Sequence, residues 1–145
     1  MDRALFETAK AVRERAHAPY SKFHVGAAIR TEAGTVHAGA NVENASYPEG
    51  WCAETSAIAN MVAAAPEGPG RRIAAVSVVA SRIDGRLTTP CGGCRQRLAE
   101  FAGPDTPVDV IDPDGAGRTF TMRELLPAAF ALDETTTGIT TGSAP

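Results

Sequence analysis

The run IAAVSVVA, from Ile73 to Ala80, is almost continuous in apolar residues and has the length of a single strand. A run of this kind is typical of a central strand that is covered on both faces of its sheet. On either side of it, segments with helical spacing alternate with segments of strand type. This alternation predicts an α/β fold with helices on both faces of the sheet.

The flanking segments predict four helices and, together with the central run, five strands. Asp2 can cap a first helix, whose apolar residues recur at helical spacing until Pro19 ends it. Thr121 and Glu124 form a capping box that opens a short last helix. The remaining elements are helices at about 52–65 and 92–101 and strands at 23–29, around 36–38, at 108–111 and near 119.

The composition predicts one globular domain and narrows the classes of partner. The chain has 145 residues, of which 43% are hydrophobic, so it can bury a core without disulfides or metal. We expect this domain to span residues 1–132, followed by a disordered Thr/Gly-rich tail over 133–145. The formal charge is −3 with both signs interspersed, which argues against binding to a polynucleotide or an anionic membrane.

The N-terminal sequence and the cysteine content indicate the compartment. The segment MDRALFETAK carries acidic residues and no apolar stretch, unlike a secretory signal. The chain nowhere reaches the roughly 18 consecutive apolar residues of a membrane helix. We therefore expect a cytoplasmic protein with no membrane partner, whose three cysteines stay unpaired.

The positions of the three cysteines predict a metal site. Cys52 lies at the start of one predicted helix, and Cys91 and Cys94 lie at the start of another. A helix N-terminus lowers the pKa of a thiol and so favours the thiolate, which is the form that binds metal. Two such helix starts can converge on one tetrahedral zinc and leave its fourth position open for chemistry. This predicts one catalytic Zn²⁺ per chain.

Three other interpretations of the cysteines remain open at this point. Free cysteines are often simply buried, and a C-x-x-C can be a redox pair, although that motif is expected earlier in a βαβ pattern. A structural zinc would need a fourth ligand, and the sequence has no fourth cysteine. The imidazoles of His17, His24 and His37 are expected on the surface or in turns.

Beyond the cysteines, four segments carry a resemblance to a known family. C-A-E at 52–54 followed by P-C-x-x-C at 90–94 matches the zinc deaminase pattern in its three-cysteine form. The chain as a whole closely resembles the small homotetrameric zinc-dependent cytidine deaminases, which implies a three-layer α/β/α sandwich with a mixed, about five-stranded sheet. The segments, in chain order, are PYSKFHVGAAI (19–29), GANVENASYPEGWCAE (39–54), PCGGCRQRLAEF (90–101) and ELLPAAF (124–130).

The resemblance implies hydrolytic deamination of cytidine and deoxycytidine to uridine and deoxyuridine, with release of ammonia, in pyrimidine salvage. Zinc activates the water for attack at C4 of the pyrimidine. A carboxylate two residues after a ligand can reach both this water and the ring, so Glu54 is expected to move the protons. A first-turn glutamate can also simply complement the helix dipole.

Other residues are expected to bind the substrate. Asn41 and Glu43 alternate at the end of a predicted strand, so both should point to one side, where an amide and a carboxylate suit sugar hydroxyls. The resemblance assigns them to the ribose and its 3′-OH, whereas solvated strand-end side chains are the plainer interpretation. The resemblance also places Phe23 against the pyrimidine; the alternative is that Phe23 only packs in the core. It further places the backbone of Ala53 and Pro90 near the ring.

Two aromatic residues are expected to act between subunits. In the homotetramer that the resemblance implies, Tyr47 and Phe130 complete the pocket of a neighbouring subunit. The alternative for Phe130 is that it caps the core of its own chain.

One position departs from the family pattern. Relatives with three cysteine ligands usually have arginine directly after the glutamate, and here that residue is Thr55. Three thiolates leave zinc with a net negative charge, which weakens it as a Lewis acid. Either Arg95 and Gln96 contribute more to the surroundings of the sulfur atoms, or the zinc is tuned differently.

Two further functions compete with the main one. The chain could deaminate a modified nucleoside or a nucleoside antibiotic such as blasticidin S, with Glu49 and Trp51 altering the selectivity of the pocket. It could instead be a non-catalytic zinc-binding module, although such a module has no need for a carboxylate at Glu54 or for the Asn41-x-Glu43 pair.

Overall fold

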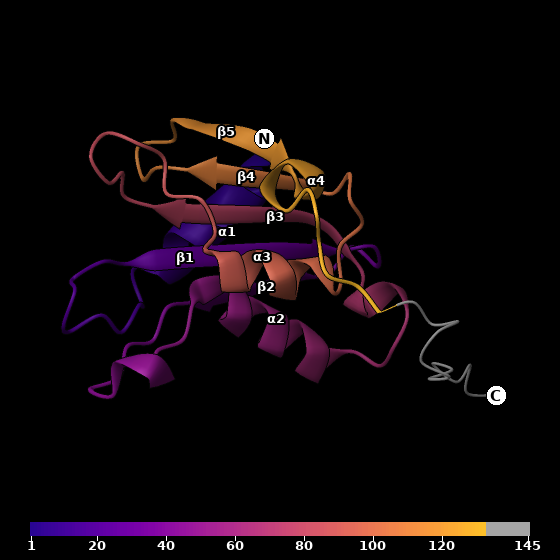
Figure 1. Cartoon of the computed structure of the whole chain (residues 1–145), viewed down its shortest axis with the longest axis horizontal. Coiled ribbons are helices and arrows are strands. Elements are labelled where there is room, and N and C mark those ends of the chain that lie inside the picture. Colours follow the sequence, from indigo (N-terminus) through magenta and orange to yellow (C-terminus); the bar gives the residue numbers. More distant parts are fainter. Residues whose placement is uncertain (133–145) are drawn as a thin grey trace.

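At the centre of the computed structural model, which describes residues 1–132, lies a five-stranded sheet (Figure 1). The strand order is β2-β1-β3-β4-β5, and only the pair β3 and β4 is parallel, so the sheet is mixed. The predicted buried run is the middle strand, β3. The strands are β1 (Val25–Thr31), β2 (Val36–Ala40), β3 (Ile73–Ala80), β4 (Pro107–Ile111) and β5 (Gly117–Thr121).

Helices cover both faces of this sheet (Figure 1). One core joins α1 to the sheet and contains Leu5, Phe6 and Ala9, and a second core on the opposite face joins α2, α3 and α4. The predicted α/β fold and its three layers are therefore confirmed. The helices are α1 (Arg3–Arg13), α2 (Ala53–Ala64), α3 (Gly92–Ala99) and α4 (Met122–Leu125), with short 3₁₀ turns at Tyr47–Glu49 and Pro69–Arg71.

Burial on both faces explains the composition of β3 and β1. In β3, Val76 and Val78 pack in one core and Val79 packs in the other. In β1, where the sequence suggests alternation, all four residues of 26–29 are buried, because α1 and α2 lie on opposite sides of the sheet. A Cβ on Gly26 would lie 2.1 Å from the carbonyl oxygen of Ala9, so α1 packs directly on the strand backbone.

The first helix begins as predicted but ends early. The carboxylate of Asp2 accepts a hydrogen bond from the N–H of Leu5 and caps α1. The helix ends at Arg13 and not at Pro19, because the segment that follows pairs with another part of the chain. His17 exchanges backbone hydrogen bonds with the segment just after β2, at 3.0 Å to Asn41 and 2.7 Å from Glu43.

The other predicted elements agree with the structure to within about two residues at most ends. The capping box of Thr121 and Glu124 is present at the start of α4. The expected tail, 133–145, lies outside the described residues. Within the described part of the chain, no helix combines the length and apolar character needed to cross a membrane.

Candidate active site

The three cysteines meet where two helices begin. Cys52 is the N-cap of α2, Cys91 is the N-cap of α3, and Cys94 lies in the first turn of α3. Their sulfur atoms all lie within 4.8 Å of one another, and those of Cys52 and Cys91 are 4.0 Å apart. Tetrahedral zinc with Zn–S bonds of about 2.3 Å needs sulfur atoms about 3.8 Å apart. The donor set therefore fits zinc.

The pKa values of two of the three thiols are shifted in opposite directions. Hydrogen bonding to the Cys94 thiol lowers the pKa of Cys52 to about 6, and Cys91 and the positive charge of Arg97 act in the same direction. The same interaction with Cys52, together with burial, raises the pKa of Cys94. One thiolate is thus available at neutral pH, as metal binding requires.

Glu54 lies in the first turn of α2 and is buried, with 4% of its surface exposed. Its Oε2 accepts a hydrogen bond from Sγ of Cys94 at 3.4 Å. Burial is the main cause that raises the pKa of this carboxyl, against a smaller opposing effect of Arg97. A buried carboxyl with a raised pKa beside a metal cluster has the properties of a general acid and base.

The position of α2, and so of Glu54, is set by close contact with β2. A Cβ on Gly39 would lie 2.3 Å from the backbone nitrogen of Ala57, so no other residue type leaves room for the helix. The hydroxyl of Ser56 also donates to the carbonyl of Ala40 at 2.9 Å. The start of α2 is therefore held against the strand that leads to Asn41.

A cavity of about 310 Å³ opens beside the cysteines and contains most of the predicted substrate residues. Phe23, Asn41, Glu43 and Ala53 line it together with Cys52, Cys91 and Glu54. The structure thus brings these residues together, although the sequence separates them by up to 68 positions. Trp51 also lines the cavity, at its rim, with half of its side chain exposed.

Asn41 and Glu43 lie just beyond β2, on either side of Val42, and each already has partners within the chain. Asn41 accepts from the N–H of Val25 at 2.8 Å and donates to the carbonyl of Phe23 at 2.9 Å. It therefore fixes the start of β1, and with it the aromatic ring that lines the cavity. The assignment of Asn41 and Glu43 to a sugar stays a prediction.

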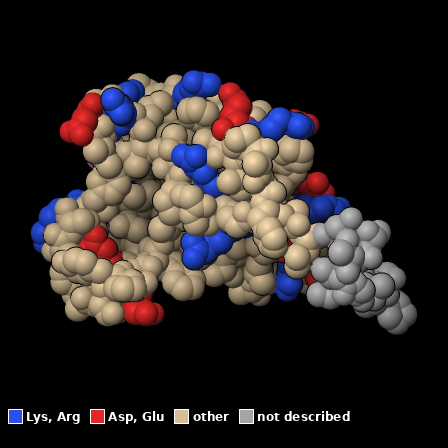
Figure 2. Space-filling view, in the orientation of Figure 1, with Lys and Arg blue, Asp and Glu red and all other residues tan. Residues whose placement is uncertain are grey.

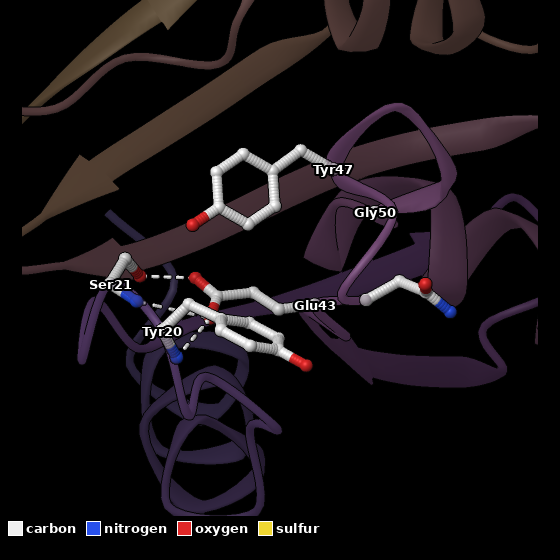
Figure 3. A pocket seen from close by; sticks show the side chains of 6 residues that line it. Tyr20, Ser21, Glu43, Tyr47 and Gly50 are labelled. Carbon is white, nitrogen blue, oxygen red and sulfur yellow. Dashed lines mark hydrogen bonds between the residues drawn. The ribbon is translucent and has the colours of Figure 1, made fainter.

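The partners of Glu43 are residues for which the sequence analysis predicts no role. Its carboxylate accepts hydrogen bonds from the N–H groups of Tyr20 and Ser21, at 2.9 and 3.2 Å, and from the Ser21 hydroxyl (Figure 3). The hydrogen bond from that hydroxyl is the main cause that lowers the pKa of Glu43. The sequence did contain a sign of this contact, because Tyr20 and Ser21 belong to the segment 19–29 that resembles the family.

Tyr47 and Phe130 do not line the metal cavity of their own chain. Tyr47 is 74% exposed and lies over a neighbouring cavity of about 340 Å³, with its ring 5.8 Å from that of Tyr20 (Figure 3). Phe130 is 71% exposed, so it does not cap the core, and its carbonyl accepts from the amide of Gln96. Their role between subunits stays a prediction.

Of the three residues expected around the sulfur atoms, Thr55 lies near one of them, whereas Arg95 and Gln96 make their hydrogen bonds elsewhere. The Thr55 hydroxyl lies 3.8 Å from Sγ of Cys94. Arg95 instead directs its donors to Pro90, Thr89 and Leu125, at 2.8 to 2.9 Å. Arg95 therefore holds the loop before Cys91 against α4, and the Gln96 amide donates to the carbonyl of Phe130.

Comparison with known proteins agrees with this geometry. Residues 1–108 match the family described as the cytidine and deoxycytidylate deaminase zinc-binding region. A cytidine deaminase of Halalkalibacterium halodurans is 43% identical over 136 residues, which cover 92% of this chain and 98% of that protein. A blasticidin-S deaminase of Bacillus cereus is 31% identical over 76% of this chain and 79% of its own.

A solved structure extends the agreement to the fold. The crystal structure of cytidine deaminase from Burkholderia pseudomallei superposes with a TM-score of 0.81 at 43% identity, covering 90% of this chain and all of that one. The zinc-binding region of the matched family contains the Cys52, Cys91 and Cys94 cluster, so zinc is the metal of this site. The chain belongs to the cytidine and deoxycytidylate deaminase zinc-binding family.

Proposed function

We propose that this chain catalyses the hydrolytic deamination of cytidine and deoxycytidine to uridine and deoxyuridine, with release of ammonia. The observation that carries the proposal is the buried Glu54, placed against Cys94 at the edge of a cavity of nucleoside size. Zinc held by the three thiolates supplies the Lewis acid and the activated water for this reaction.

Glu54 is positioned to carry the protons. It takes the proton that the attacking water loses and delivers it to N3 of the pyrimidine, while the new C4–O bond forms. A further transfer protonates the amino group, and ammonia leaves as the C4–N4 bond breaks. Burial raises the pKa of this carboxyl, which makes it easier for the side chain to hold the proton between the two transfers.

Other residues that line the cavity suit a sugar and a pyrimidine ring. Glu43 has a lowered pKa, so its carboxylate is ionised at neutral pH and can accept a hydrogen bond from a hydroxyl group. Phe23 offers an apolar face for the ring, held in place through the hydrogen bond from Asn41 to its carbonyl. These contacts favour a nucleoside over a free base.

The formal charge of the chain argues against a polynucleotide substrate. On the face drawn in Figure 2, blue and red side chains are interspersed on the described residues, without a continuous basic stripe. A long nucleic acid would require such a stripe to neutralise its phosphates. We propose that the substrate is a free nucleoside in a cytoplasmic salvage reaction.

A second candidate substrate is a nucleoside antibiotic. The blasticidin-S deaminase of Bacillus cereus is 31% identical to this chain, and Trp51 at the cavity rim could contact a substituent on the sugar. The sequence identity to the cytidine deaminase of Halalkalibacterium halodurans is higher, at 43%, which favours the ordinary nucleoside as substrate.

A substrate panel tests these functions. The purified protein is incubated with cytidine, deoxycytidine, cytosine, adenosine, blasticidin S and CMP, and ammonia release is followed. We expect turnover of the first two alone. Turnover of blasticidin S alone would favour the second candidate, and no ammonia from any compound would favour a non-catalytic zinc-binding module.

A further inference from the structure

The cysteine cluster places excess negative charge at one point of the molecule. Three thiolates outweigh the two positive charges of Zn²⁺ and leave a net charge of about −1. Glu54 adds a carboxyl whose Oε2 is 3.4 Å from Sγ of Cys94, and Thr55 offers only a neutral hydroxyl. Uncompensated charge of this kind makes a metal a weaker Lewis acid, and groups around the ligands normally tune it.

Two arginines follow Cys94 on α3, and within the described residues their guanidinium groups differ in whether they have hydrogen-bond partners. The donors of Arg95 go to Pro90, Thr89 and Leu125. Across residues 1–132, the guanidinium of Arg97 makes no hydrogen bond and no salt bridge, although its backbone is part of the helix. Its guanidinium is therefore available.

The helix geometry directs Arg97 toward the metal ligands. Residues three apart lie on neighbouring positions of a helix surface, and helical side chains lean toward the N-terminus. Arg97 is three residues after Cys94, and a Cβ on Gly93 would lie 2.9 Å from its Nη1. The guanidinium thus lies over Gly93, one of the two residues between the ligands Cys91 and Cys94 of the C-x-x-C.

We propose that Arg97 offsets the negative charge of the zinc–thiolate site and so maintains the reactivity of the metal. It is a positioning residue that acts through the cysteine ligands, because it is not among the residues that line the substrate cavity. The plainer alternative is that Arg97, in the last turn of α3, only complements the helix dipole. That role would change stability alone.

The test uses the full chain with Arg97→Met, Arg97→Lys and Arg97→Glu, and Arg123→Met as a matched exposed arginine on α4. Each protein is loaded with Co²⁺, and the thiolate-to-cobalt charge-transfer band is recorded. A cation near sulfur stabilises its lone pairs, so Arg97→Met should move the band to longer wavelength and Arg97→Glu should move it further. Arg97→Lys and Arg123→Met should match the parent protein.

The zinc-loaded proteins supply the second measurement. With cytidine, Arg97→Met should lower kcat about tenfold, as is usual when a residue that supports a metal ligand is lost. KM should not change, because Arg97 does not line the cavity. A band and a kcat that match the parent in both Arg97→Met and Arg97→Glu would overturn the proposal, as would a loss of melting temperature alone.

This inference rests on the zinc site and, for its kcat measurement, on the proposed function. The cobalt spectrum needs no substrate, so a chain that deaminates nothing but shows the graded band shift would refute the function and retain the role of Arg97. If Arg97→Lys showed the same band shift and the same loss of kcat as Arg97→Met, the role of the positive charge would be refuted.

Discussion

Glu54 illustrates how one residue obtains its chemistry from its surroundings. A glutamate in the first turn of a helix normally faces solvent and complements the helix dipole. Here the packing of α2 on β2 buries the side chain and turns it toward Sγ of Cys94. Burial of a carboxyl without a cation in direct contact costs stability, and such costs are typical of residues that function selects.

At this scale we predict that Glu54→Gln keeps the fold and the zinc but loses nearly all turnover, because an amide cannot carry protons. Removal of a general acid and base usually lowers the rate by about 10²–10⁴-fold. Ammonia release and zinc content are measured on the same samples, with Cys91→Ala as the contrasting variant that loses metal and activity together. Retention of more than about a hundredth of the activity would contradict the role of Glu54.

Glu43 allows a second prediction at the residue scale. Glu43→Ala should raise KM for cytidine and also lower kcat, because binding of the sugar helps to position the ring. Ser21→Ala, which removes one of several partners of the carboxylate, should have a smaller effect. Free cytosine should be a poor substrate of the parent protein. Equal kcat/KM values for cytosine and cytidine would exclude Glu43 from sugar binding.

At the scale of elements, helix starts decide the site and the stability of the chain. The starts of α2 and α3 hold the metal ligands, whereas the start of α1 is fastened by its own cap. Asp2 accepts from the N–H of Leu5 at 3.1 Å and pairs with Arg30 of β1 at 2.7 Å. The hydrogen bond from Leu5, followed by Arg30, lowers the pKa of the Asp2 carboxyl.

This cap gives a prediction about stability. Asp2→Ala should lower the free energy of unfolding by about 1 kcal/mol at pH 7, the usual value of an N-cap, whereas Asp2→Asn should lose less because it keeps the cap. Because the folded pKa lies below the ordinary 3.8, the contribution is present above that value and is lost as the pH falls through the folded pKa.

Urea unfolding of the parent and the variant, both stripped of zinc so that release of metal at low pH does not contribute, checks this dependence. The difference between the parent and Asp2→Ala should shrink as the buffer is taken from pH 7 to below the folded pKa. Glu14→Ala, at the other end of α1 and exposed, should change stability little. A difference that is independent of pH would show that the charge of Asp2 contributes nothing.

At the scale of the whole molecule, three exposed aromatic side chains line the metal cavity and the cavity beside it. Trp51 lines the metal cavity, and Tyr20 and Tyr47 line the cavity beside it. Between 48% and 74% of the surface of each of these three side chains is exposed. Exposed apolar patches of this kind mark sites where another molecule or subunit binds. The single chain therefore leaves its pocket open.

We predict that roughly four chains assemble in solution and that each pocket is completed by residues of its neighbours. Light scattering measures the mass, and activity is followed while the assembly is split by dilution. Phe130→Ala should remain tetrameric and lose activity, because the ring is exposed in the single chain and stabilises no core. A fully active monomer would refute the shared pocket.

The sequence by itself determined the elements and the metal. The apolar run 73–80 predicts β3 because a strand covered on both faces needs apolar residues at every position. The capping residues Asp2 and Thr121 predict helix starts, because their side chains satisfy the N–H groups of the first turn. Cysteines at two other helix starts predict the ligands for the same local reason. Each of these signals lies within a few residues of the feature that it predicts.

Only the tertiary structure decided how distant segments meet. α1 ends at Arg13 because the backbone of His17 pairs with the segment after β2, and Tyr20 and Ser21 hold Glu43 for the same reason. Within residues 1–132 the guanidinium of Arg97 has no hydrogen-bond partner and lies over Gly93, whereas Arg95 donates to Pro90, Thr89 and Leu125. Such contacts depend on which surfaces the packed sheet and helices bring together, and a local pattern of apolar and polar residues contains no information about partners more than 20 positions away.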